Sequence, residues 1–211
     1  MEKAAESIIC GIDEVGRGPL AGPVVASAVI LSSENMIPGL RDSKKLRAEQ
    51  RETLAESIYT HALATGTAWI WHDEIDRINI HWASLSAMRA ALDSAMRSFF
   101  RTQRNVETVN MENFMIRIDG KFVPDMEKSA FRDIIHNSSV QAIVKGDELI
   151  PAISAASIIA KVARDTWMTE YHKIEPQYGF DKHKGYPTVA HRTAIHRYGP
   201  SAIQRMTFKA G

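Results

Sequence analysis

Short apolar runs of strand length alternate along this chain with longer segments of helical periodicity, and this alternation constrains the fold most. The predicted strands cover residues 8–12, 24–31, 65–71, 114–118 and 140–144. Predicted helices cover residues 48–63, the stripe that steps by three and four from Leu85 to Phe99, residues 153–172, and a segment that Thr188 caps and Gly199 ends. Strands and helices interleaved in this way indicate an α/β domain with a helical C-terminal extension.

The length and composition fit one such domain with an appended region. The chain has 211 residues, of which 45% are hydrophobic and 24% charged, as in ordinary globular proteins, and this excludes an intrinsically disordered chain. We expect a sheet domain over residues 1–172 and a helical region over residues 173–211. The glycine-rich segment 16–23 between the first two predicted strands suits a wide hairpin.

Cysteine content and the N-terminal residues bear on the compartment. The single cysteine, Cys10, excludes an intramolecular disulfide and a cysteine-based zinc site, and its apolar neighbours favour a buried residue over a reactive thiol. No run of about 18 apolar residues is present, and the acidic N-terminus lacks the apolar core of a secretory signal. We therefore expect a cytoplasmic protein without a membrane span.

Charge is distributed unevenly along the chain. Residues 172–211 carry seven Lys or Arg and two Asp or Glu, a net charge of +5, whereas residues 1–171 carry −4. A basic C-terminal part on an acidic body is consistent with a polyanionic partner. An ordinary solvated surface without a partner explains the same counts equally well.

Carboxylates follow three of the predicted strands. Asp13 and Glu14 end the first strand, Asp119 ends the strand at 114–118, and Asp147 follows the strand at 140–144. If these strands are neighbours, the four acids converge at the carboxyl ends of the sheet and repel one another. Oxygen-only ligands favour Mg²⁺ or Mn²⁺, and two such ions about 4 Å apart form the clamp used for phosphodiester hydrolysis.

Each of these acids also has a simpler interpretation. An aspartate after a strand often forms a turn or caps a helix. Adjacent residues on a regular strand point to opposite faces, so Asp13 and Glu14 reach one site only if the strand bends or ends there. The glycine at position 16 is compatible with such a bend.

Several sequence blocks resemble one nuclease family. The segment from Gly11 to Ala26, GIDEVGRGPLAGPVVA, is similar to the opening signature of ribonuclease HII, the type 2 ribonuclease H family. The similarity continues, in family order, at residues 42–46, 75–80, 118–120, 145–147, 154–165 and 183–188. The resemblance therefore extends over nearly the whole chain.

The resemblance implies a ribonuclease H-like fold, with a mixed central sheet flanked by helices and a C-terminal helical region. It implies endonucleolytic cleavage of the RNA strand of RNA/DNA hybrids, and of duplex DNA 5′ to an embedded ribonucleotide, leaving 3′-hydroxyl and 5′-phosphate ends. The positions that match the four metal-binding acids of the family are Asp13, Glu14, Asp119 and Asp147. Gly16, Arg17 and Gly18 match the motif that recognises the 2′-hydroxyl, and Tyr186 matches the tyrosine that packs on the adjoining sugar.

Elementary chemistry agrees with these assignments. A Gly-Arg-Gly loop lets backbone amides approach a sugar closely, arginine offers several donors, and a tyrosine ring stacks on a sugar or base. The side chains that we expect to contact the nucleic-acid backbone are Lys44, Lys45, Asn79, Lys145, Lys161 and Lys184, although any one of the lysines is equally well explained as a solvated residue. For Asp165 we expect an ion pair with Arg164 or Lys161.

Two features depart from the family pattern. The interval from Asp119 to Asp147 is long, and its stretch 125–133 predicts an inserted helix or turn. The sequence also ends soon after Phe208, so we expect no partner-docking tail, and we expect a monomer.

Two other functions remain open on the sequence. A different nuclease of the same fold would keep the acids without the Gly-Arg-Gly loop. A nucleic-acid-binding protein without catalysis would bind hybrids and yield no metal-dependent products.

Overall fold

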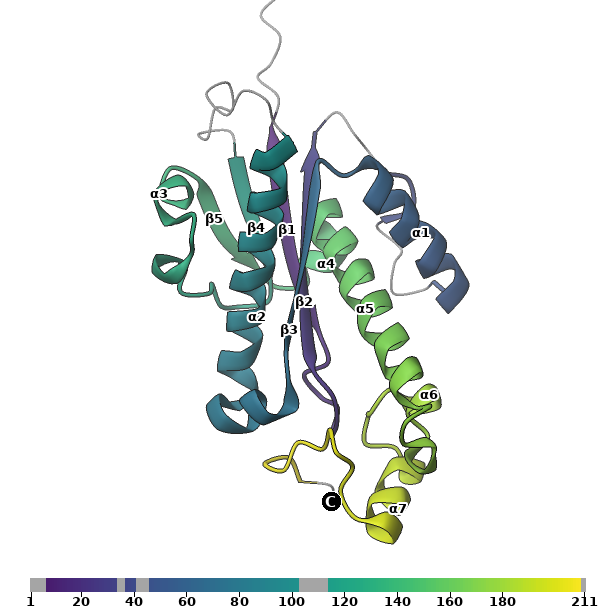
Figure 1. Ribbon diagram of the computed structural model, residues 1–211. Helices are drawn as coiled ribbons and strands as arrows, with labels where there is room; N and C mark the ends of the chain where they lie inside the picture. Colours follow the sequence, from purple (N-terminus) through teal and green to yellow (C-terminus); the bar gives the residue numbers. More distant parts are fainter. Residues whose placement is uncertain (1–6, 34–36, 41–45, 103–113, 210–211) are drawn as a thin grey trace, which may run out of the picture.

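The computed structural model describes residues 7–33, 37–40, 46–102 and 114–209, and it is built around a five-stranded sheet (Figure 1). The strands are β1 (Ile8–Val15), β2 (Val24–Ser32), β3 (Ala64–Ile70), β4 (Phe114–Asp119) and β5 (Ser139–Ile143). Their order in the sheet is β3-β2-β1-β4-β5. β1 pairs antiparallel with β2 and parallel with β4, so the sheet is mixed and the expected hairpin is confirmed.

Helices cover both faces of this sheet. They are α1 (Ala48–His61), α2 (His72–Thr102), α3 (Arg132–Ile135), α4 (Gly146–Leu149), α5 (Pro151–Tyr171), α6 (Phe180–His183) and α7 (Val189–Tyr198), with 3-10 turns η4 (Met126–Lys128) and η5 (Pro176–Tyr178). Figure 1 shows α2 on one face and α5 with α1 on the other. The expected α/β architecture with C-terminal helices is therefore confirmed.

The core explains why these segments pair. Every residue of β2 is buried, because this strand lies between α2 on one face and α5 on the other. Cys10 and Ile12 of β1 pack with the α2 layer, and Cys10 is a buried free thiol, as expected. On the opposite face, a Cβ at Gly11 would lie 2.0 Å from the carbonyl carbon of Ala152, so the start of α5 rests directly on β1.

Two elements differ from their predicted extents. β1 continues to Val15 because Asp13 and Glu14 remain paired with Ser27 and Ala26 of β2, so these acids lie inside the strand rather than after it. The helix predicted around Leu85–Phe99 spans His72–Thr102 and is interrupted at Asn79, whose φ is 65°.

The stretch 125–133 forms the predicted helical turns. It contains η4 and the start of α3, and it packs against α2. The Ser129 hydroxyl donates to Asp93 of α2 at 2.5 Å, and the rings of Phe131 and Phe100 stack. The stretch therefore covers an edge of the α2 layer.

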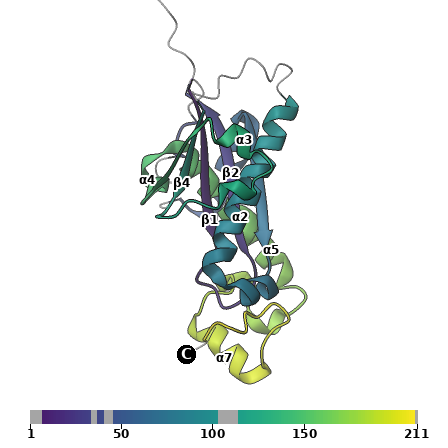
Figure 2. The same ribbon diagram turned by 90° about the vertical axis from the view of Figure 1, so that its left-hand side faces the viewer.

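The C-terminal region packs against the loop between β1 and β2, which we call the 16–23 loop. The Arg205 amide donates to the Leu20 carbonyl at 2.9 Å, and the Gly22 amide donates to the Ile203 carbonyl at 2.9 Å. Both views place this region beyond the end of the sheet where β1 finishes (Figures 1 and 2). The division of the chain into domains at residue 172 stays a prediction.

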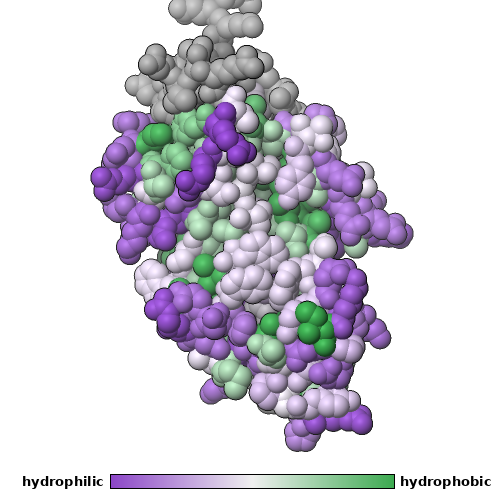
Figure 3. Space-filling model, in the orientation of Figure 1, coloured by the Kyte–Doolittle hydropathy of each residue, from purple (hydrophilic) through white to green (hydrophobic). Residues whose placement is uncertain are grey.

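The face of the molecule in Figure 3 carries both polar and apolar side chains. In the orientation of Figure 1, polar side chains cover the flanks and apolar ones form scattered patches (Figure 3). No helix in the described ranges has the apolar length that crossing a bilayer requires.

Candidate active site

Asp13 and Asp119 lie on the same face of two neighbouring parallel strands. Ile12 of β1 is paired with Ile118 of β4, and each acid comes one residue later. Ile12 and Ile118 both point into the α2 layer, so the next side chains point to the opposite face, toward α5. The Ser157 hydroxyl of α5 accordingly donates a hydrogen bond to the Asp13 carboxylate. The parallel pairing thus brings together two acids that lie about a hundred positions apart.

The Asp13 carboxylate is buried in an unfavourable environment. Its side chain is almost fully buried, and burial raises its pKa well above 3.8. The negative charges of Glu14 and Asp119 raise the pKa further, and the Ser157 hydroxyl and the Glu14 amide, which donates at 2.7 Å, oppose the rise only in part. The three carboxylates therefore lie close enough to repel one another.

Glu14 is oriented by an arginine. The Arg17 guanidinium donates to Glu14 Oε1 at 3.1 Å and lowers the Glu14 pKa, but burial is the larger influence and raises it. Glu14 Oε2 is buried and has no hydrogen-bond partner among the residues that the structure describes. A buried carboxylate oxygen without a partner is a site that a cation would satisfy.

Asp147 comes from the other side of Asp119. It lies in the first turn of α4, directly after β5, and its side chain is buried. The amide of the preceding residue, Gly146, donates to Asp119 Oδ1 at 2.7 Å, which fixes the start of α4 against the end of β4. The four predicted acids thus belong to one end of three adjacent strands, β1, β4 and β5.

This set of carboxylates has the donor chemistry for a hard divalent cation. The donors are all oxygen atoms, the charges of Asp13, Glu14 and Asp119 repel one another, and Glu14 has a buried oxygen that no described residue bonds. In the described part of the chain, no three His, Cys, Asp or Glu side chains already surround one point as metal ligands. The residues that would hold such an ion are the four acids, and the ion would offset their negative charge.

The Gly-Arg-Gly segment lies beside Tyr186. A Cβ built on Gly18 would lie 3.8 Å from Cε1 of the Tyr186 ring, and that ring is 36% exposed. The Lys161 ammonium lies 5.7 Å from the ring centroid. Arg17 links this surface to the acids through Glu14. The two motifs that the resemblance assigns to ribose recognition are therefore neighbours in space.

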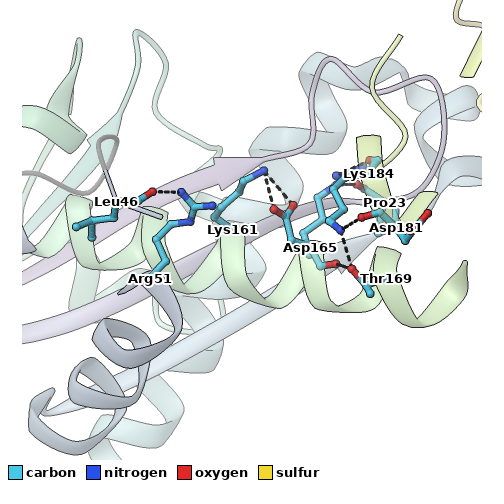
Figure 4. Close-up of polar contacts among 9 residues, drawn as sticks. Pro23, Leu46, Arg51, Lys161, Asp165, Thr169, Asp181 and Lys184 are labelled. Carbon is cyan, nitrogen blue, oxygen red and sulfur yellow. Dashed lines mark hydrogen bonds and ion pairs between the residues drawn. The ribbon is translucent and has the colours of Figure 1, made fainter. Parts of the chain in front are cut away.

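The predicted backbone-contacting lysines have different surroundings (Figure 4). Lys161 pairs with Asp165 at 3.0 Å, which confirms the ion pair expected for Asp165. The Lys184 ammonium donates to the Thr169 hydroxyl at 2.7 Å and to the Asp181 carbonyl, so it joins α5 to α6. Lys145 is exposed, with a left-handed backbone just before α4. Lys44 and Lys45 lie outside the described residues.

Asn79 has a structural role in addition to the predicted one. Its side-chain oxygen accepts from the amides of His81 at 3.0 Å and Trp82 at 3.3 Å, where α2 restarts after the kink. The residue is exposed, and its contact with nucleic acid stays a prediction.

A cavity of about 250 Å³ lies between α1 and α5, next to Lys161 and Lys184. The charged residues that line it are Arg51, Glu52, Lys161, Asp165, Glu170 and Lys184. Three of these described lining residues are cationic and three are anionic, so their formal charges cancel.

Sequence reasoning missed two buried arginines. Arg164 and Arg205 are fully buried and donate to backbone carbonyls of the 16–23 loop. Arg205 is one of the seven basic residues of the C-terminal part, but its guanidinium is internal, so the expectation of a basic surface is wrong for this residue. Arg164 stands in a recognised sequence block, but nothing in the pattern around Arg205 marks it.

Comparisons with known proteins give a consistent result. The family model described as Ribonuclease HII matches residues 10–210. A ribonuclease HII from Desulforamulus reducens is 46% identical over 199 residues, which are 94% of this chain and 88% of the relative.

Two solved structures share the fold over nearly their whole length. The ribonuclease H2 from Pyrococcus horikoshii has a TM-score of 0.73 and 26% identity, and the alignment covers 96% of this chain and 94% of that one. The ribonuclease HII in a complex with PCNA from Archaeoglobus fulgidus has a TM-score of 0.66 and 25% identity, covering 96% and 95%. Together with the match over residues 10–210, these similarities establish that the chain belongs to the ribonuclease HII family of hydrolytic nucleases.

Proposed function

We propose that this protein is a divalent-metal-dependent endoribonuclease. It cleaves the RNA strand of RNA/DNA hybrids, and it cleaves duplex DNA on the 5′ side of an embedded ribonucleotide. The products carry 3′-hydroxyl and 5′-phosphate ends. The catalytic and metal-binding residues are Asp13, Glu14, Asp119 and Asp147, and the ribonucleotide is recognised by Gly16, Arg17, Gly18 and Tyr186.

One observation carries this proposal. The mutually repelling carboxylates lie next to the surface where Tyr186 adjoins Gly18, and Arg17 connects the two through its 3.1 Å bond to Glu14. A candidate cation site and a glycine-containing loop that a ribose could approach closely are therefore adjacent. This adjacency supports a nuclease that cuts beside the sugar it recognises.

Each group has a task that its chemistry allows. Two Mg²⁺ or Mn²⁺ ions held by the four acids would neutralise the scissile phosphate and provide an activated water. Glycines 16 and 18 allow the backbone to approach the ribose, where the 2′-hydroxyl distinguishes RNA from DNA. Tyr186 packs on the adjoining sugar, and Arg17 holds Glu14 in place.

A duplex DNA with a single ribonucleotide tests the proposal. The substrate, an all-DNA duplex of the same sequence and an RNA/DNA hybrid are incubated with Mg²⁺, with Mn²⁺ and with excess EDTA, and the ends are mapped. We expect one cut 5′ to the ribonucleotide, cuts in the hybrid, and no products with EDTA or from the all-DNA duplex. Asp119→Asn abolishes cleavage while hybrid binding persists.

Full cleavage in EDTA would contradict the metal mechanism. Cleavage of the hybrid alone would contradict the single-ribonucleotide specificity, because a type 1 ribonuclease H needs a run of ribonucleotides. That the enzyme acts as a monomer stays a prediction, which light scattering of the purified chain tests.

A further inference from the structure

Among the described residues, the Arg205 guanidinium donates to three backbone carbonyls of the 16–23 loop. Its Nη2 donates to the Gly16 carbonyl at 2.7 Å, its Nη1 to the Arg17 carbonyl at 3.1 Å, and its Nε to the Gly22 carbonyl at 2.8 Å. One planar guanidinium therefore holds both ends of this loop. Two of the three carbonyls belong to the Gly-Arg-Gly segment itself.

Arg164 of α5 holds the same loop at other carbonyls and ties it to a second segment. Its Nε donates to the Pro23 carbonyl at 2.9 Å and its Nη2 to the Ala21 carbonyl at 3.2 Å. Its Nη1 donates at 3.0 Å to the carbonyl of Lys184, in the segment that carries Tyr186. The guanidinium carbon lies 5.9 Å from the Tyr186 ring centroid. Figure 4 shows Pro23 and Lys184 beside α5.

The two charges are buried at a cost to stability. Both side chains are fully buried, and among the described residues neither arginine forms an ion pair with a carboxylate. Burial, together with the neighbouring charge of Arg164, lowers the pKa of Arg205 to about 9, so the residue remains charged at neutral pH. Apolar side chains of similar size would leave the six backbone carbonyls that the two guanidiniums satisfy without donors, which costs free energy. The two buried charges are therefore tied to the conformation of the loop whose carbonyls they hold.

Gly16 allows the close approach of Arg164 to the loop. Its φ is +92°, and a Cβ at this position would lie 2.3 Å from Nε of Arg164. The glycine therefore leaves room for the guanidinium as well as for the turn. A side chain at position 16 would therefore displace the Arg164 guanidinium from the loop.

We propose that Arg164 and Arg205 are positioning residues that hold the Gly16–Gly18 backbone in register with Tyr186, and so set the enzyme's preference for a ribonucleotide. This inference rests on the proposed function. Neither arginine touches the substrate, and each acts through the carbonyls that it holds. The planar fork matters more than the charge, because a lysine ammonium is a point donor that cannot span three separate carbonyls in fixed directions.

The test compares Arg205→Lys and Arg164→Lys with the control Gln204→Ala. Gln204 is buried beside Arg205 and ties the same C-terminal segment to the same loop, through a 2.9 Å bond from Nε2 to the Leu20 carbonyl. It makes no bond to the Gly-Arg-Gly carbonyls. Each protein is assayed for melting temperature, for kcat and KM on a duplex with a single ribonucleotide, and for the Kd of the all-DNA duplex.

We expect each lysine variant to lose up to about 100-fold in kcat at the ribonucleotide, because a small misplacement of a substrate-orienting group has effects of this size. Affinity for the all-DNA duplex stays within about twofold, since phosphate contacts do not depend on this loop. The control keeps its kcat even if its melting temperature falls.

A lysine variant that folds and retains wild-type kcat overturns the inference, and so does an equal loss of kcat in Gln204→Ala. The two lysine variants are independent, so one that folds is sufficient for the test. Failure of the wild-type enzyme to cut at the ribonucleotide would instead overturn the proposed function.

Discussion

At the scale of single residues, the buried charges of the candidate catalytic acids lower the stability of the folded protein. The Asp13 carboxylate is almost fully buried beside two other carboxylates, and its pKa is raised by burial and by their charges. The unfolded chain therefore loses this proton at a lower pH than the folded one. Stability consequently falls as pH rises from 3.8 through the folded pKa, and the loss persists at neutral pH in the absence of a cation.

Asp13→Asn should accordingly stabilise the metal-free protein while it abolishes cleavage. Asparagine keeps an oxygen for the Ser157 and Glu14 donors and removes the buried charge. We expect a gain of roughly 0.5 to 2 kcal/mol in EDTA, measured by urea unfolding at pH 8. The control is Asp133→Asn, whose side chain is 88% exposed and which should change neither property. A clear loss of stability in Asp13→Asn would show that the buried charge is already compensated.

At the scale of elements, periodicity and turn residues located most of the fold. The β1–β2 hairpin, α5 and the cap of α7 by Thr188 all agree with the sequence, because each is set by local pattern: the Thr188 hydroxyl accepts from the His191 amide at 3.2 Å. The interruption of α2 at Asn79 was missed, because its positive φ depends on one side chain capping the next segment. The candidate acids are predictable because they lie at or near the ends of apolar strands. The position of Arg205 depends on a tertiary contact, which no local sequence pattern indicates.

The contact between β1 and α5 depends on one glycine. A Cβ at Gly11 would collide with backbone atoms of Ala152 and Ile153, which cannot move independently of α5. We expect Gly11→Ala to destabilise the fold by about 3 kcal/mol or more, as overpacking of a rigid contact does. Gly18→Ala is the matched control, because its Cβ meets only the Tyr186 ring at 3.8 Å. It should keep the melting temperature and lose cleavage at the ribonucleotide; equal melting temperatures for both variants would contradict this packing argument.

The segment that carries Tyr186 is held by two neutral histidines. The rings of His183 and His191 stack at 4.5 Å. His183 Nδ1 accepts from the Gly185 amide at 3.2 Å, and His191 Nδ1 donates to the Tyr186 carbonyl at 3.1 Å. Within the described ranges, His191 Nε2 is buried without a hydrogen-bond partner. A second proton on His183 would point at the Gly185 amide, which is itself a donor. A second proton on His191 would have no hydrogen-bond acceptor among the described residues.

Burial lowers the pKa of both histidines below 6.5. Asp181 opposes this shift at His183, whereas Lys184 adds to it. As pH falls below about 6.5, the unfolded chain takes up protons first, so stability is lost with a slope of up to about 1.4 kcal/mol per pH unit for each ring. His191→Asn should flatten the dependence of melting temperature on pH between about 5 and 7. The exposed His196 is the control, and a flat wild-type profile would contradict the argument.

At the scale of the whole molecule, the uneven charge has a direction in space. The basic C-terminal region lies at the end of the sheet where β1 finishes, next to the 16–23 loop (Figures 1 and 2). Its exposed cations are Lys173, Lys182, Arg192, Arg197 and Lys209. The remaining chain carries a net charge of −4, so we expect a nucleic acid to be attracted mainly at this end. The candidate active site and the basic C-terminal region thus lie at the same end of the molecule.

Binding should therefore weaken steeply with salt, and Lys145 should contribute to the slope. Lys145 is exposed directly before the α4 turn that carries Asp147, so it is placed to meet a phosphate near the acids. We expect Lys145→Ala to reduce the slope of log Kd against log salt by about 1, measured on a hybrid between about 50 and 200 mM KCl. Lys128→Ala is the control, because this lysine is 70% exposed and paired with Asp125 on the insert beside α2. An unchanged slope in Lys145→Ala would show that this lysine does not contact a phosphate. An equal change in both variants would show that the slope depends on the net charge of the protein and not on the position of Lys145.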